Sequence, residues 1–210
     1  FNGNKEVGAI KVESNDIVGK FITGGEYNTE VDKEYVDSKV ETSEQDGTIY
    51  VGVSNKVIVK ESSNGEVKVS KESAIAGEKV TLTLTAKSGY KLKSVKAVDK
   101  DNKEVKIENN QFTMVDSDVT ITAEFEQIIY SVIEGANQKI EGEKEVTIKI
   151  DANYDLFDKV YVDGKELEAT NYTVVSGSTV VTLNKDYVKS LSKEKHELKV
   201  TFKDGASVTT

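Results

Sequence analysis

Strict alternation of apolar and polar residues is the feature that most constrains this chain. Every second residue is apolar in the stretches 80–85, 119–125, 146–150 and 198–202. A period of two residues is typical of strands with one buried side and one solvent-facing side. The sequence therefore predicts many short strands, each able to bury only one face.

Turn signals separate these alternating stretches. Dipeptides that end in Gly favour the tight turns of β-hairpins, and four stand between predicted strands: Asn64-Gly65, Asp163-Gly164, Ser176-Gly177 and Asp204-Gly205. Helical patterns are short and lie at 30–37, behind a possible Thr29 cap, and near 185–191, behind Asn184. Short, regularly punctuated strands with so little helix predict an all-β protein built from small sandwich-like modules.

Charge and composition exclude several functions. The chain has 28 basic and 37 acidic residues, a formal net charge of -9, and no Cys. Every basic residue is Lys, so the planar guanidinium that captures phosphate is missing, and an acidic surface repels nucleic acid. Thiolate chemistry and Cys-based metal sites are excluded. We expect no nucleic-acid partner, no cofactor and no membrane insertion, because no apolar run is long enough to cross a bilayer.

The first segment, residues 1–52, carries the strings Ile22–Tyr27, Glu34–Asp37 and Asp46–Val51. A paired-Gly rung, a short helix and an Asp-Gly-Thr strand in this order resemble the closing rungs of right-handed parallel β-helices in surface proteins of Gram-positive bacteria. The resemblance implies the C-terminal end of a β-helix-like solenoid with a short capping helix.

The second segment, residues 53–126, contains Ala76–Leu82, Gly89–Leu92, Phe112–Met114 and Val115–Phe125. These strings resemble the divergent internalin B-type repeats of bacteria. The resemblance implies a small β repeat module in an exported protein, and says little about what the module binds.

The third segment, residues 127–210, opens at Tyr130–Asn137 and continues through Val160–Leu167, Asn171–Thr173 and Ser176–Leu183 to His196–Gly205. It resembles the immunoglobulin-like X2 modules of clostridial cell-surface and glycan-degrading proteins. The resemblance implies an immunoglobulin-like β-sandwich that acts as a spacer or helps attachment to polysaccharide.

No residue set predicts catalysis. His196 is the only His, so any Ser–His–Asp arrangement must include it, and we interpret it as structural. Paired carboxylates such as Asp116 with Asp118, and Glu141 with Glu143 and Glu145, lie in polar turns where solvent keeps them ordinary acids. We therefore predict no enzyme activity.

One string resembles a calcium loop. Asp151, Asn153 and Asp155 have the alternate spacing of calcium ligands, but Leu156 and Val162 stand where an EF-hand needs Gly and Glu. An Asx-rich turn between strands explains the same spacing. Asp151, Asn153 and Asp155 are the candidate calcium ligands of this chain. We expect that folding requires no metal.

Aromatic side chains provide the only ligand-binding candidates. The chain has nine Tyr and no Trp, the residue with the largest face for stacking on a sugar. Tyr161 alternates with Val160 and Val162, so burial of the two Val would turn it outward. Tyr154 and Tyr172 are the nearest aromatics that could join it. Cross-strand packing of Tyr161 is the simpler explanation.

These features together predict a non-catalytic stalk of an exported bacterial surface protein, monomeric, and either attached to the cell wall or secreted. The stalk presents an upstream domain to an unidentified host or environmental glycan or protein. The alternative is an accessory carbohydrate-binding module of a secreted glycan-degrading enzyme. Two or three coplanar Tyr would favour the alternative, and a single exposed Tyr favours the stalk.

Overall fold

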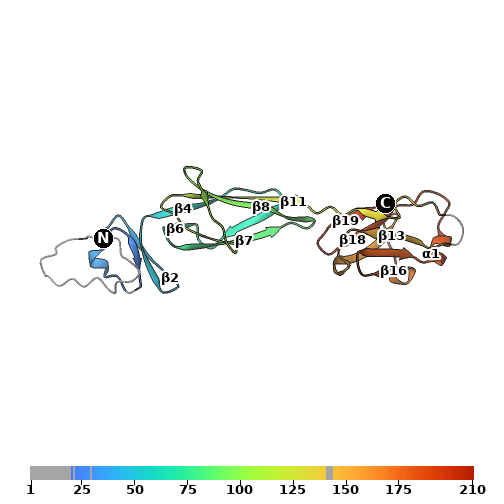
Figure 1. Cartoon of the computed structure of the whole chain (residues 1–210), viewed down its shortest axis with the longest axis horizontal. Helices are drawn as coiled ribbons and strands as arrows, with labels where there is room; N and C mark the ends of the chain where they lie inside the picture. The colour runs from blue at the N-terminus through green and yellow to red at the C-terminus, as the bar shows by residue number, and fades with distance from the viewer. Residues whose placement is uncertain (1–19, 21, 29, 141–143) are drawn as a thin grey trace. The chain divides into compact units, whose positions relative to one another are not determined.

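The computed structural model describes residues 20, 22–28, 30–140 and 144–210 of the chain. These residues divide into two compact units, of which the first comprises residues up to Thr85 with Leu92–Phe125, and the second Ala86–Lys91 with Glu126–Thr210. Both units consist mainly of small antiparallel sheets (Figure 1). No helix in the described ranges is long and apolar enough to span a membrane.

The first unit begins with a small antiparallel sheet. Its strand order is β1 (Gly25–Tyr27), β3 (Thr48–Gly52), β2 (Glu41–Gln45), and one 3₁₀ turn, η1 (Lys33–Tyr35), precedes β2. The side chains of Ile22, Val36 and Val51 form its small core. A parallel bridge joins Ile22 to Val36.

The described part of residues 1–52 does not form the predicted β-helix. Rungs of a solenoid pair in parallel, whereas β3 pairs antiparallel with both of its neighbours. The reason lies at Asp46 and Gly47, whose φ angles of 51° and 75° close a two-residue hairpin between β2 and β3. The predicted capping helix is reduced to η1, capped by Asp32, and Thr29 and residues 1–19 lie outside the described residues.

Two sheets follow in the first unit and enclose its main core. The larger has the order β6 (Ser73–Ile75), β4 (Ser54–Val59), β11 (Val119–Gln127), β8 (Tyr90–Asp99), β9 (Glu104–Val105). The smaller has the order β10 (Gln111–Thr113), β7 (Lys79–Ala86), β5 (Gly65–Val69). Alternation places Val80 and Leu82 of β7 against Val119 and Ile121 of β11, and all four are almost fully buried. The pairing of β4 with β11 is parallel.

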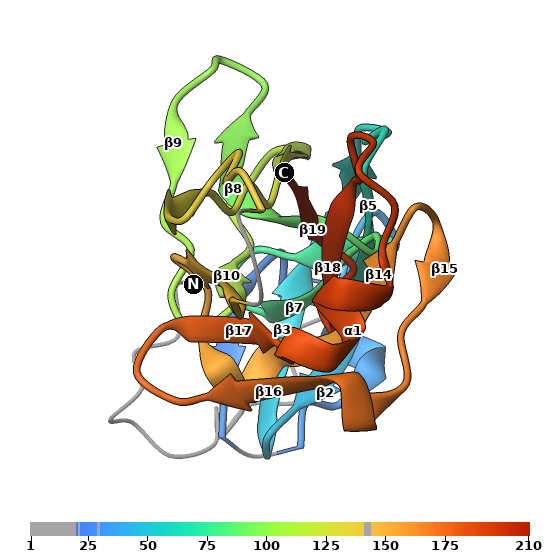
Figure 2. The ribbon, with the colours of Figure 1, turned by 90° about the vertical axis from the view of Figure 1, so that its right-hand side faces the viewer.

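The second unit is a two-layer sandwich of four-stranded sheets. One sheet has the order β12 (Val132–Glu134), β13 (Val146–Ile150), β17 (Thr179–Leu183), β16 (Tyr172–Val175). The other has the order β15 (Lys165–Glu166), β14 (Phe157–Val162), β18 (Leu198–Phe202), β19 (Ser207–Thr209). Both contribute to one core, and Figure 2, which faces this unit, shows β16 and β17 in one layer and β18 and β19 in the other.

Short helical turns connect these strands: η2 (Tyr154–Leu156), η3 (Ala169–Asn171) and α1 (Lys185–Ser190). The position of α1 confirms the helix predicted behind Asn184, although the Asn184 amide donates to the Thr170 carbonyl and does not cap the helix. The Asp163-Gly164 turn is also confirmed, with both φ angles positive between the paired residues Val162 and Lys165.

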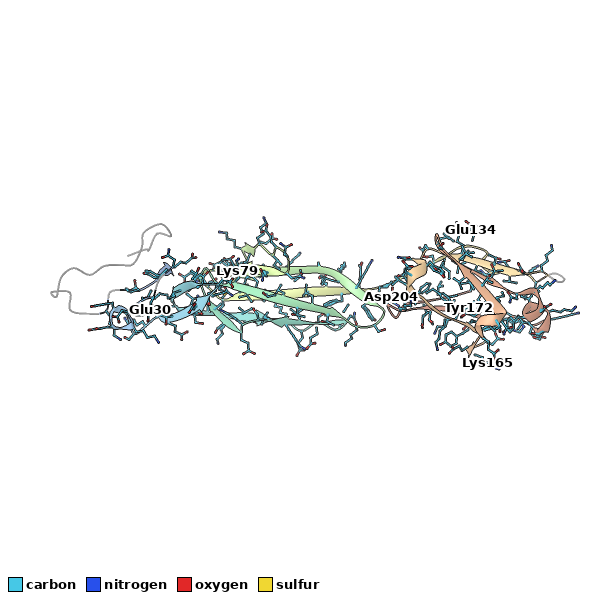
Figure 3. The ribbon with its side chains drawn as sticks, turned by 90° about the horizontal axis from the view of Figure 1, so that it is seen from below. Glu30, Lys79, Glu134, Lys165, Tyr172 and Asp204 are labelled. Carbon is cyan, nitrogen blue, oxygen red and sulfur yellow. The ribbon has the colours of Figure 1, made fainter. Side chains whose placement is uncertain are left out.

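A buried carboxylate joins the N-terminal sheet to the sheets that follow it. Glu78 is 1% exposed, and its Oε1 accepts hydrogen bonds from the Ser43 hydroxyl at 2.6 Å and from the Lys71 ammonium, while Oε2 accepts from the Ile75 N–H. Burial alone would raise the pKa of Glu78, but these hydrogen bonds outweigh it and lower the pKa. Gln45 adds two reciprocal hydrogen bonds to the Lys79 backbone. Strand β2 is thereby held to the turn before β7, near Lys79 in Figure 3.

Replacing this carboxylate should weaken the first unit. Glu78→Gln leaves the Lys71 ammonium without its anion and should lower the free energy of unfolding by about 1.5–3 kcal/mol, the usual range for hydrogen bonds to charged groups. Ser43→Ala should cost about 1 kcal/mol in the native background and much less in the Glu78→Gln background, because the two side chains share one bond. Urea denaturation of the four proteins measures both effects.

Thr42→Ala is the matched control for this experiment, since Thr42 lies on the same strand with its side chain exposed. It should change stability little in either background. Equal effects of Ser43→Ala in the two backgrounds would contradict the role given to Glu78.

Candidate functional site

Tyr161 lies where the alternation predicts it, on the outer face of β14. Its neighbours Val160 and Val162 are 0% and 5% exposed, and Tyr161 is half-buried. Its cross-strand partners are Glu166 on β15 and Lys199 on β18. These partners are charged, so Tyr161 stands on this face among polar side chains and not in an aromatic cluster.

The other two aromatic candidates do not share that face. Tyr172 belongs to β16 in the opposite sheet, where it packs against the core and meets the Phe157 ring at 6.1 Å between centroids. Burial, followed by the charges of Glu166 and Asp158, raises the pKa of Tyr172. Tyr154 is 39% exposed and begins the 3₁₀ turn η2. Tyr161 therefore lies on a sheet face, Tyr172 on a packed edge strand and Tyr154 in a turn. Tyr172 is labelled in Figure 3.

The calcium-like string forms an Asx turn. Asn153 is the N-cap of η2, and its Oδ1 accepts a hydrogen bond from the Asp155 N–H at 3.0 Å. Asp151 Oδ1 accepts from the Ser131 N–H, which ties the string to the segment before β12. Asn153 Oδ1 and Asp151 Oδ1 are thus both engaged with backbone N–H groups. Within the described ranges, no three His, Cys, Asp or Glu side chains gather as a metal-binding group.

The carboxylate pairs have individual roles where the structure describes them. Asp118 Oδ1 accepts a hydrogen bond from the Lys56 N–H at 2.8 Å, and Asp116 is exposed. Glu145 is also exposed, while Glu141 and Glu143 lie outside the described residues. Asp118 therefore serves to join the start of β11 to β4.

The structure brings His196 together with Asp163 and Ser192, a cluster that we name the His196 clasp. Nδ1 of His196 donates to Asp163 Oδ2 at 2.6 Å, and Nε2 lies 3.2 Å from both the hydroxyl and the carbonyl oxygen of Ser192. Asp163 also accepts from the Glu197 N–H through Oδ1. The clasp joins the β14–β15 hairpin to the loop between α1 and β18.

Residue types alone would make this cluster a Ser–His–Asp triad. A general base needs a free lone pair on Nε2, but the Ser192 carbonyl can only accept, so it favours a proton on that nitrogen. The hydrogen bond to the Asp163 carboxylate, followed by that to the Ser192 carbonyl, raises the pKa of His196. The geometry thus suits an imidazolium that bridges two loops better than a base that activates a nucleophile.

Sequence reasoning singled out His196 but not its partners. Asp163 is 33 residues away and was interpreted only as part of a turn, and Ser192 stands in a polar loop without distinctive spacing. A polar side chain at the first position of a predicted Asp-Gly hairpin is a common site for hydrogen bonds to a neighbouring loop. No local pattern identifies which loop that is.

Fold and site together define a multi-unit β protein with separate small cores. Residues 55–129 form a divergent InlB B-repeat domain, which confirms the resemblance of the second segment. Domains of this kind usually occur in exported bacterial surface proteins. The chain matches no curated protein and no solved structure. The β-helix and X2 resemblances receive no support from these comparisons.

The His196 clasp should make stability depend on pH. Its hydrogen bonds raise the pKa of His196, so its stabilisation is complete below the unfolded value of about 6.5 and disappears as pH rises through the folded value. The hydrogen bond from His196, followed by that from Glu197, lowers the pKa of Asp163, so the same contact is lost only when pH falls through that lowered value. His196→Ala should therefore destabilise most between about pH 4 and 6.5, and clearly less at pH 9.

Chemical denaturation across this pH range measures the difference. Asp163→Asn is the control, because Asn tolerates the φ of 50° at this position and removes only the charge. In that background, the effect of His196→Ala should depend less on pH above pH 5, because the largest cause of the raised pKa of His196 is removed. A constant penalty from pH 5 to pH 9 in the native background would show that His196 stabilises only by packing.

Proposed function

We propose that this chain is a non-catalytic structural stalk segment of an exported bacterial surface protein, cell-wall attached or secreted, that presents another domain of a longer chain. The divergent InlB B-repeat domain supports the surface location. The observation that carries the mechanical role is the parallel pairing of β4 with β11, the first and last strands of that domain.

Parallel terminal strands resist tension. Val57, Ile58 and Val59 of β4 pair with Val119, Thr120 and Ile121 of β11. A pull on the two ends of the domain drags these strands past one another in opposite directions, so the bonds between them bear the load together. Strands peeled from one end lose their bonds one at a time. The pairing therefore suits a segment that transmits force.

Further bonds lie on either side of this pairing. The Lys60 N–H donates to the Ile121 carbonyl at 2.9 Å at one end, and the Lys56 N–H donates to the Asp118 carboxylate at the other. The Val57 N–H points to the other neighbour and donates to the Glu72 carbonyl. Strand β4 is thus held on both sides, which suits a strand placed under load.

The second unit fits the role of a spacer. Lettered along the chain, its strands give the orders A-B-E-D and C′-C-F-G, which include the two sheets of constant-type immunoglobulin sandwiches. We interpret the unit as immunoglobulin-like on this ground. Its core is continuous between the two sheets, and among the described residues every buried side-chain polar atom has a hydrogen-bond partner, which supports a passive role.

The alternative, an accessory carbohydrate-binding module, finds little support in the aromatic side chains. One ring on a sugar resembles a single stacking contact of about 0.5–1.5 kcal/mol, whereas millimolar affinity needs about 4 kcal/mol. Tyr161 has no second ring beside it among its strand partners. We therefore favour the stalk.

Force spectroscopy on the full chain tests the mechanical role. The absence of Cys allows handles to be placed by paired substitutions. Val53→Cys with Gln127→Cys loads β4 and β11 in shear, and Val53→Cys with Ser117→Cys peels them from one end. We expect a clearly higher unfolding force for the shear pair, because unfolding under force depends on the barrier of the loaded bonds.

Asp118→Ala should lower the shear force by removing the bond to the Lys56 N–H. Asp116→Ala is its control, two residues away and exposed, and should leave the force unchanged. Equal forces in the two pulling directions would overturn the stalk proposal.

Affinity gels test the alternative. We expect no retardation of the chain in gels that contain starch, xylan or soluble cellulose, because one half-buried ring is too weak a site. Tyr161→Ala should migrate like the native chain in every gel. Retardation that disappears in Tyr161→Ala and persists in Tyr154→Ala would instead establish a carbohydrate-binding module.

A further inference from the structure

A cavity opens at one end of the second unit, between its two sheets and beside α1. Its volume is about 910 Å³, within the range of small-molecule sites, which runs from about 300 to 1,000 Å³. The floor is apolar and draws on both sheets and the helix: Val146, Ile148, Leu183, Val162, Leu198 and Val188. No polar side chain of the described core interrupts this floor, so it suits a hydrocarbon group.

The mouth of the cavity exposes apolar surface to water. Ile140 is 45% exposed, and Val146 and Leu191 are half-buried. Hydrogen bonds hold the segment that carries this edge, since the Asn137 N–H donates to the Thr210 hydroxyl and the Gln138 amide donates to the Gly135 carbonyl. Covering this surface with a hydrocarbon chain would release water from it without reshaping the rim.

Positive charge surrounds the mouth. Among the described residues, Lys139, Lys189, Lys193 and Lys195 line it, together with the carboxylate of Glu194. This concentration is unusual in a chain with a net charge of -9. Lys139, Lys193 and Lys195 are exposed and form no ion pair within the described residues. His196 also lines the cavity, but both its ring nitrogens face Asp163 and Ser192, so it is not counted as a free cation.

We propose that this cavity binds a single-chain alkyl carboxylate, a ligand of the fatty-acid type. The carboxylate lies between the ammonium groups of Lys193 and Lys195, and the alkyl chain covers the accessible apolar surface of Ile140, Val146 and Leu191 above the buried floor. Charge complementarity selects this occupant, because a cationic amphiphile of the same length would meet the same floor but be repelled at the rim. A short anion such as acetate would gain only the exposed charge contacts, which are weak.

Titration of the full chain with decanoate below its micelle concentration, followed by amide NMR shifts, tests the proposal. Decyltrimethylammonium and acetate are the ligand controls. Lys193→Gln/Lys195→Gln removes two of the rim charges, and Lys165→Gln/Lys100→Gln is the matched variant, with the same change of net charge at exposed positions that do not line the cavity. Lys165 is labelled in Figure 3, on the β14–β15 hairpin. Circular dichroism checks that both variants fold.

Saturable shifts with decanoate should appear at 137–140 and 188–198, with little response to the two control ligands. The rim variant should bind decanoate about fivefold more weakly, as expected for the loss of two exposed charge contacts, and the matched variant should bind like the native chain. The proposal is overturned by absent or unsaturable shifts, by equal binding of decanoate and decyltrimethylammonium, or by equal losses in the two variants.

Discussion

The main core of each unit is one layer of apolar side chains closed between two small sheets. The strands have a period of two, so they offer one apolar face each, and that face is buried only when a second sheet covers it. Val160 and Val200 from one sheet and Ile150 and Val181 from the other are all 0% exposed, which shows how completely the layer is closed in the second unit. The chain has no Cys, so no disulfide reinforces these thin cores. Their stability rests on burial and on a few placed polar contacts.

The most demanding of those contacts is the buried carboxylate of Glu78. A buried charge is costly unless every oxygen is satisfied, and here both oxygens accept hydrogen bonds. The contact contributes specificity, because an alternative docking of the N-terminal sheet would leave the carboxylate partly unsatisfied. The sheet is small and its own core has three fully buried residues, so hydrophobic contact alone would fix its position poorly. The Gly77 turn contributes to the fit, since a Cβ there would clash with the Glu26 side chain and a φ of 96° favours Gly.

Local patterns predicted the strands, several turns and the position of α1, because each depends on neighbouring residues. The orientation of Tyr161 followed from Val160 and Val162 for the same reason. The β-helix interpretation was wrong for the described residues because Asp46-Gly47 forms a hairpin turn. The resemblance over about fifty residues assigned this dipeptide to a solenoid strand instead. The His196 clasp could not be predicted, since Asp163 and His196 meet only after two loops from different strands are brought together. The cavity likewise depends on the fold, because its lysines come from the segment before β13, from α1 and from the loop after α1.

The clasp and the cavity share one loop, and this links their chemistry. Ser192 and His196 flank Lys193 and Lys195 in the sequence. The hydrogen bonds from His196 to Asp163 and to the Ser192 carbonyl therefore restrain the backbone of the segment that carries these two lysines. The clasp also neutralises charge locally: Asp163 is paired with His196, and its anion is therefore not available to the lysines. Loss of one proton from the imidazolium would remove its positive charge beside the Asp163 carboxylate and one of the two N–H groups that hold the loop. Both changes weaken the positive potential at the mouth of the cavity. This potential therefore depends on the protonation of His196.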